Sequence, residues 1–248
     1  CGPSRASLYT GTYLQNHRSV INGTPLDARL TNVALEARKA GYDPVLFGYT
    51  DVSADPRHRR SNDPALRTYG GVLPGMTPVI HVDDDVLPWL ADLKAKGYTV
   101  PEGFLGVFKP RDVGAKAGHR GLTFAPAQYT AEDSYTAFLT DEVIKYLSVR
   151  KERPWFVHLS YLTPHPPFVA PEPYHDMYDP ADVPRPVRAA TVEIEASQHP
   201  YLDYYLHHQR GWGLRYDHDS KNNLKLDDQD VLQARATYYG MMSEVDAH

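Results

Sequence analysis

The chain of 248 residues has one cysteine, few methionines and tryptophans, and no excess of positive charge. A single cysteine excludes an internal disulfide framework and a zinc site built from cysteines. The formal net charge of −5 provides no basic surface of the kind that binds nucleic acid, so we expect no nucleic-acid partner. No apolar run reaches the length of a membrane span and no signal peptide is visible, so we expect no membrane association.

The chain also lacks an initiator methionine and opens directly on CGPSRASLYTG. We therefore expect a fragment, incomplete at both ends, that forms one partial catalytic domain over residues 1–248. Its 42% apolar residues are enough for a sizeable core. Because a lone cysteine is compatible with a reducing compartment, we expect a cytoplasmic protein.

The first eleven residues place a thiol, a proline, an arginine and a glycine at fixed spacing. Pro3 is suited to the first turn of a helix, and Gly11 is a typical helix stop. Cys1 is therefore expected at a helix N-terminus, where free amides and the helix dipole favour a thiolate or an anionic substrate group. Arg5 lies one turn further on and can reach back toward residue 1. The pattern predicts a nucleophile beside a fixed cation; a buried cysteine in an ordinary helix is the alternative.

Apolar spacing further along the chain indicates alternating helices and strands. It predicts a helix over residues 26–40 and a short strand over 44–50. Residues 52–82 are irregular and typical of an active-site rim or a subunit contact. Further elements are expected as helices over 87–97, 130–150 and 227–248, and as a buried strand over 155–162. This order predicts an α/β fold with a doubly wound parallel sheet, helices on both faces and long irregular insertions.

Several polar residues follow the expected strands or stand in tight turns. Tyr49 and Thr50 fall at a strand's carboxyl end, where such sheets gather catalytic groups. In the alternative interpretation, Tyr49 caps the sheet edge and Asp51 starts a turn. His165 stands between prolines directly after another strand, a position poorly explained by packing. Asn22 belongs to an Asn-Gly pair and is also explained as a left-handed turn residue.

Three runs of acidic residues or histidines invite a metal interpretation. Residues 83–85 are all aspartates, but a carboxylate-rich start for the helix over 87–97 is the simpler account. Residues 207–208 and 217–219 crowd histidines and aspartates together, and we interpret them as surface or interface features.

The motif CxPSR with its following glycine resembles the signature of the sulfatases and the related phosphonate monoester hydrolases, within the alkaline phosphatase superfamily. The stretch YLQNHRSVINGTPLD is similar to the phosphonate monoester hydrolase branch in particular. The resemblance implies hydrolysis of sulfate esters, phosphonate monoesters or phosphodiesters, with a small anionic ester as substrate. It also implies that a formylglycine-generating enzyme oxidises Cys1 to formylglycine, whose hydrated aldehyde attacks sulfur or phosphorus.

The resemblance implies that Cys1, Arg5 and His165 are catalytic. It also implies that Asn22, Tyr49 and Thr50 bind the substrate. Arg5 would steady the nucleophile, and Asn22 and His165 would contact the transferred group. Asp51 departs from the family pattern, which has a threonine in this region. A divalent metal, Mn or Ca, would bind formylglycine at position 1, with its other ligands outside this chain. We therefore expect the 248 residues alone to be inactive.

Two readings from other classes stay open. If Cys1 is a mature N-terminus, the chain could be an amidohydrolase whose own α-amine is the base, although this leaves the residues Pro3 to Arg5 unexplained. The chain could also be a non-catalytic remnant or binding module that keeps the fold. A second copy of the chain is open as a partner, in a homo-oligomer.

Overall fold

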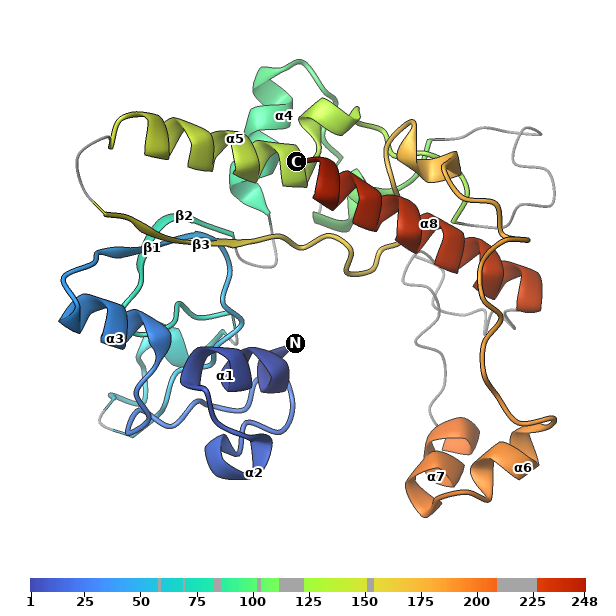
Figure 1. The fold of residues 1–248 in the computed structure, drawn as a ribbon, viewed down its shortest axis with the longest axis horizontal. Helices are drawn as coiled ribbons and strands as arrows, with labels where there is room; N and C mark the ends of the chain where they lie inside the picture. The colour runs from blue at the N-terminus through green and yellow to red at the C-terminus, as the bar shows by residue number, and fades with distance from the viewer. Residues whose placement is uncertain are drawn as a thin grey trace. The chain divides into compact units, whose positions relative to one another are not determined.

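The computed structural model describes residues 1–57, 59–68, 70–82, 86–101, 104–111, 123–150, 154–208 and 227–248 (Figure 1). The acidic runs at 83–85 and 217–219 lie outside the described residues. The described α-helices are α1 (Gly2–Thr10), α2 (Leu14–His17), α3 (Val33–Lys39), α4 (Leu87–Ala95), α5 (Tyr135–Ser148), α6 (Val192–Ala196), α7 (Pro200–His208) and α8 (Asp228–Ala247). The described strands are β1 (Pro44–Gly48), β2 (Thr77–His81) and β3 (Phe156–Ser160). In the described part of the chain, no helix combines the length and apolar character that crossing a membrane requires.

The three strands form a parallel sheet in the order β2-β1-β3. The central strand β1 is buried along its whole length and pairs with β3 in register from Pro44 opposite Phe156 to Gly48 opposite Ser160. Figure 1 shows α4 and α5 on one side of the sheet and α1 and α3 on the other. A strand covered on both faces must be apolar throughout, which the sequence of β1 is. The predicted α/β fold with a parallel sheet is confirmed.

Strand β2 lies inside the stretch 52–82, for which we predicted no regular structure, and that prediction is wrong for this segment. Its first three residues are exposed, so it carries no apolar pattern. It also contains Pro78, which cannot donate to a sheet and is tolerated because β2 is an edge strand of the described sheet. A strand with an exposed half and a proline gives little signal in the sequence.

Helix α3 begins later than the apolar spacing over 26–40 predicted. The side chain of Asn32 accepts hydrogen bonds from the backbone N–H groups of Ala34 and Leu35 and so caps the helix. The residues before Asn32 form a loop, in which Pro25 makes an isolated parallel bridge with Ser53. This loop contributes Leu26 to a buried cluster with residues of α1, α3 and β1.

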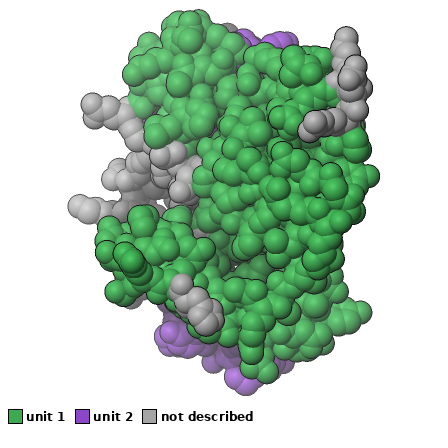
Figure 2. All heavy atoms as spheres, turned by 90° about the vertical axis from the view of Figure 1, so that its left-hand side faces the viewer, with its two compact units in different colours: residues 1–104, 135–162 green, residues 105–134, 163–248 purple. Residues whose placement is uncertain are grey.

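The chain divides into two compact units, residues 1–104 with 135–162, and residues 105–134 with 163–248 (Figure 2). Unit 1 contains the sheet and every predicted site residue except His165. In unit 2, α8 starts with a capping box between Asp227 and Asp230 and packs Leu232 and Ala236 into an apolar cluster. The predicted C-terminal helix is confirmed.

Candidate active site

Helix α1 presents the only cysteine of the chain at its first position. Cys1 is the N-cap residue, its side chain is exposed, and it makes no side-chain capping bond. Pro3 stands in the first turn, and Gly11 ends the helix in the left-handed conformation, with a φ of 66° and its N–H donated to the carbonyl of Ser7. The helix predicted from these residues is confirmed. The thiol therefore sits at the positive end of a helix, where an anion is stabilised.

Asn22 reaches this helix start from the following loop. Its Oδ1 accepts hydrogen bonds from the backbone nitrogens of Cys1, at 2.9 Å, and of Gly2, at 2.7 Å. Gly2 allows this approach, because a Cβ built on it would lie only 3.2 Å from Oδ1. Asn22 thus caps α1 from a distance in sequence. Its Nδ2 donors make no hydrogen bond within the described part of the chain and are available to a ligand.

The buried His17 ties the Asn22 loop to α1. Its Nδ1 accepts from the backbone N–H of Ser19 at 3.0 Å, so a neutral ring carries its proton on Nε2 and donates it to the hydroxyl of Ser7 at 2.9 Å. Ser19 in turn donates its own hydroxyl to the carbonyl of Thr24. No sequence pattern predicts this link, because Ser7 and His17 belong to separate elements. The bonds fix the loop from both of its ends.

Arg5 points to aromatic partners rather than back to residue 1. Its Nη1 donates to the Tyr9 hydroxyl at 3.0 Å and to the Tyr49 carbonyl at 3.2 Å, and its guanidinium lies 4.2 Å from the centre of the Tyr49 ring. Among the described residues no carboxylate forms an ion pair with Arg5. Two tyrosines therefore fix the position of the Arg5 cation, which suits binding of an anionic substrate or nucleophile. The charge of the buried Asp51 also acts on both tyrosines and raises their pKa.

Tyr9 connects Arg5 to His158 on β3. The Tyr9 hydroxyl accepts from Arg5 and lies 3.2 Å from Nε2 of His158, with the two rings edge to face. Burial raises the pKa of Tyr9, so its phenol keeps the proton that it donates to His158. Burial, and then the charge of Arg5, lowers the pKa of His158 and favours the neutral ring that accepts this proton. Neither residue was a sequence candidate, although Tyr9 stands at helical spacing from Arg5.

Thr50 and Asp51 are buried where the chain leaves β1. Thr50 donates its hydroxyl to the Gly71 carbonyl at 2.6 Å and accepts from the backbone N–H of Leu73 at 2.9 Å. Asp51 has a φ of 54°, in the left-handed region that few residues other than glycine adopt. The described contacts of Tyr49 are with Arg5. Substrate contacts by Tyr49 and Thr50 stay predictions.

His165 belongs to unit 2, whereas the other predicted site residues belong to unit 1. The side chain of His165 is exposed and close to the carbonyl of Pro166. Its role stays a prediction. No group of three or more His, Cys, Asp or Glu residues in the described part of the chain is arranged to hold a metal ion. The described residues alone therefore do not fit a complete metal site, and no step below depends on one.

These features define an α/β protein with an exposed thiol at a helix N-terminus and, in the same helix, a guanidinium held by two tyrosines. The sulfatase family model matches residues 1–248, and the chain belongs to the sulfatase family. The family resemblance of the cysteine motif is thereby confirmed.

Individual relatives agree with this family. The chain is 38% identical over 246 residues to the multifunctional alkaline phosphatase superfamily protein PehA of Trinickia caryophylli. This match covers 99% of this chain and 47% of that protein. It is 24% identical to a choline-sulfatase of Rhizobium meliloti, over 99% of this chain and 42% of that protein. The chain spans about half the length of these curated relatives.

Solved structures give the same result. The phosphonate monoester hydrolase of Agrobacterium radiobacter superposes with a TM-score of 0.85 at 40% identity, over 99% of this chain and 47% of that chain. The phosphonate monoester hydrolase SpPMH of Silicibacter pomeroyi superposes with a TM-score of 0.88 at 43% identity, over 100% of this chain and 48% of that chain. The α/β fold of this chain therefore has solved counterparts.

Proposed function

We propose that this chain is part of a hydrolase that cleaves phosphonate monoesters, with sulfate esters and phosphodiesters as related substrates. The observation that carries the proposal is helix α1, where Asn22 caps the helix at Cys1 and Tyr9 and Tyr49 hold the Arg5 guanidinium. The identity of 40% to 43% with proteins named phosphonate monoester hydrolases exceeds the 24% with the choline-sulfatase. This difference favours the phosphonate class.

Cys1 is the proposed site of conversion to formylglycine. The proposed maturation partner is a formylglycine-generating enzyme, which would act on this residue at the N-cap of α1. A hydrated aldehyde there would supply a nucleophilic hydroxyl together with a second hydroxyl that later releases the product. A divalent metal, Mn or Ca, belongs to the same proposal, with position 1 as the one ligand from the predicted set.

The chain's own residues bind and orient the substrate in this scheme. Arg5 attracts the anionic group, and Tyr9 and Tyr49 keep the guanidinium in one orientation. Asn22 uses Oδ1 to hold the helix start, which directs its Nδ2 donors to an oxygen of the transferred group. We assign His165 a second hydrogen bond to that group or to the leaving oxygen. A small anionic ester is the substrate class that these donors fit.

The test uses the full-length protein, expressed in a host that makes formylglycine. A hydrazide probe and the mass of the tryptic peptide ending at Arg5 are expected to show an aldehyde at position 1. An aryl phosphonate monoester is expected to have a higher kcat/KM than the matching aryl sulfate, and Cys1→Ala removes both activities. A persistent thiol would contradict the formylglycine proposal, and hydrolysis of neither ester by aldehyde-containing protein would contradict the proposed function.

A further inference from the structure

A pocket of about 550 Å³ opens in unit 1 and is not lined by any predicted catalytic or substrate-binding residue. Its lining includes three arginines, one aspartate and two apolar residues, namely Arg18, Arg29, Arg57, Asp27, Pro25 and Leu30. Pro25 and Leu30 belong to the loop before α3, and Arg57 follows Asp55 in the neighbouring loop. The pocket thus combines cationic groups with a small apolar wall.

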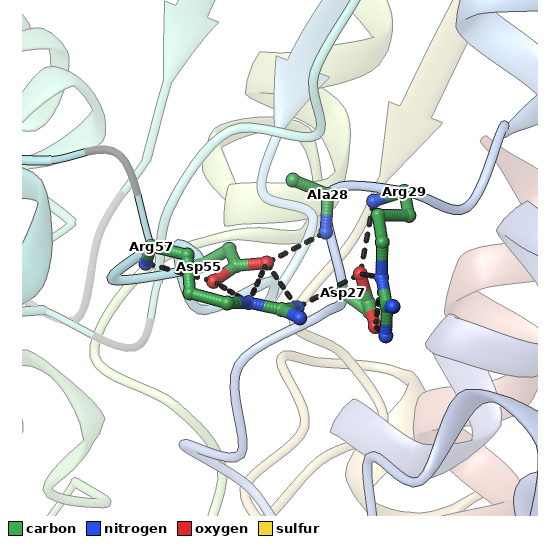
Figure 3. Close-up of polar contacts among 5 residues, drawn as sticks. All are labelled: Asp27, Ala28, Arg29, Asp55 and Arg57. Atoms are coloured by element: carbon green, nitrogen blue, oxygen red, sulfur yellow. Dashed lines mark hydrogen bonds and ion pairs between the residues drawn. The ribbon is translucent and has the colours of Figure 1, made fainter.

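Two of the arginines are paired with carboxylates (Figure 3). Arg29 pairs with Asp27 at 2.6 Å, and Arg57 bridges Asp27 at 2.8 Å and Asp55 at 2.5 Å. Hydrogen bonds to Arg29 lower the pKa of Asp27, and those to Arg57 lower the pKa of Asp55, so both carboxylates stay ionised. Asp55 also accepts from the backbone N–H of Ala28. The network fixes the positions of both guanidinium groups.

The pocket keeps unused donors after these bonds are formed. Arg29 and Arg57 use Nε and Nη2 toward the carboxylates, and their Nη1 groups make no bond to any residue that the structure describes. The exposed guanidinium of Arg18 has no partner in that part of the chain. Three guanidinium charges therefore face two carboxylates, and one positive charge is uncompensated. An oxyanion would complete the charge balance and use the donors.

Arg18 occupies a backbone position that does not call for an arginine. It ends α2 with a φ of 57°, and its N–H is donated to the carbonyl of Leu14. Glycine or asparagine adopts this left-handed conformation more readily. An arginine at this position does not stabilise the turn better than glycine would. It does add the uncompensated positive charge to the pocket.

We infer that this pocket binds a small organic anion, separate from the site at Cys1. The oxyanion group of the ligand, a carboxylate or a phosphonate, contacts Arg18 and the free Nη1 edges of Arg29 and Arg57. The apolar body of the ligand packs on Pro25 and Leu30. The position of the pocket beside the loop that carries Asn22 gives the bound anion a route to influence that loop.

The test is isothermal titration calorimetry of the full-length protein with benzoate and with phenylphosphonate. Both probes are titrated into the wild type, into Arg18→Gly and Arg18→Asn, and into the control Arg67→Asn, which removes an exposed charge elsewhere in the same unit. Each pocket variant suits the left-handed backbone, so both are expected to fold, with a melting temperature at least as high as that of the wild type.

We expect the wild type and Arg67→Asn to bind both probes at a site whose affinity falls about tenfold or more in both Arg18 variants. Binding of phenylphosphonate that is unchanged in the Arg18 variants belongs to the catalytic centre. If only benzoate binds at the Arg18-dependent site, the ligand of the pocket is a carboxylate. If only phenylphosphonate binds there, the ligand is a phosphonate. The weakening on loss of Arg18 separates this site from the catalytic centre, and hydrolysis is expected to continue in the variants. Equal binding by wild type and Arg18→Gly, or no binding by the wild type, would overturn the inference.

Discussion

Replacing Thr50 by valine removes one buried hydroxyl and almost no volume. The hydroxyl donates to the Gly71 carbonyl and accepts from the backbone N–H of Leu73, and the side chain has no exposed surface. Water cannot replace it at the Leu73 N–H, so the variant leaves a buried donor unpaired, which costs about 1–3 kcal/mol. The lost bond to the partly buried Gly71 adds about 1 kcal/mol. We expect Thr50→Val to lower the free energy of unfolding by about 2–4 kcal/mol.

The measurement is urea unfolding of the full-length protein followed by tryptophan fluorescence, because Trp89 is fully buried in the same unit. Thr50→Ser is the matched control: it keeps the hydroxyl and loses one methyl group, worth about 1 kcal/mol. The two variants should therefore differ by at least about 1 kcal/mol, with serine the more stable.

The same pair of variants separates a structural role of Thr50 from the predicted substrate contact. Below the unfolding transition, a purely structural Thr50 leaves kcat/KM the same in both variants. A substrate contact lowers kcat/KM in Thr50→Val and spares it in Thr50→Ser. An unfolding midpoint for Thr50→Val equal to that of the wild type would refute the reasoning from its two hydrogen bonds.

Three further predictions concern the strand ends and the Arg5 cluster. Gly48→Ala is expected to destabilise by about 2 kcal/mol or more, because Gly48 has a φ of 99° and a Cβ would overlap the carbonyl oxygen of Ser160; an unchanged melting temperature would contradict this. Tyr9→Phe removes the hydroxyl that accepts from Arg5 and should lower kcat/KM about tenfold, as steady-state kinetics will show; full activity would mean that Tyr9 does not orient Arg5. The lowered pKa of His158 means that the unfolded chain takes up its proton first, so stability is full above pH 6.5 and falls as the pH drops toward the lowered value. His158→Gln should therefore reduce the dependence of the unfolding free energy on pH between pH 7 and pH 5. The same pH dependence in the variant and the wild type would exclude His158 as its source.

Local signals in the sequence were enough for α1 and for two of the three strands. Pro3 and Gly11 mark the two ends of α1, and both act as expected. The apolar runs of β1 and β3 form strands that pair with each other. Strand β1 is buried along its whole length as expected, whereas β3 is half-buried except at Ser160, so the prediction of a buried strand there is only partly right. Strand β2 was missed because an edge strand needs no apolar pattern, and its pairing to β1 is a long-range contact.

The sequence supplied candidate residues for the site but not their contacts. The family motif supplied Cys1, Arg5 and Asn22, and the structure places Asn22 on the start of α1. The partners of Arg5 could not be predicted, because Tyr49 lies 44 residues away in sequence and comes close only through the sheet. The capping role of Asn22 was also out of reach, since no local pattern links residues 21 positions apart.

Unit 1 fixes its arginines in two physically different ways. Arg57 is held by two carboxylates, which neutralise its charge and give a rigid link between loops. Arg5 is held by a phenol, a backbone carbonyl and an aromatic face, all of them neutral. Burial raises the pKa of Tyr9 and of Tyr49, so neither becomes an anion beside Arg5 at neutral pH. Neutral partners orient a cation without themselves reducing its charge, so the Arg5 guanidinium keeps a fixed position in the helix that Cys1 caps.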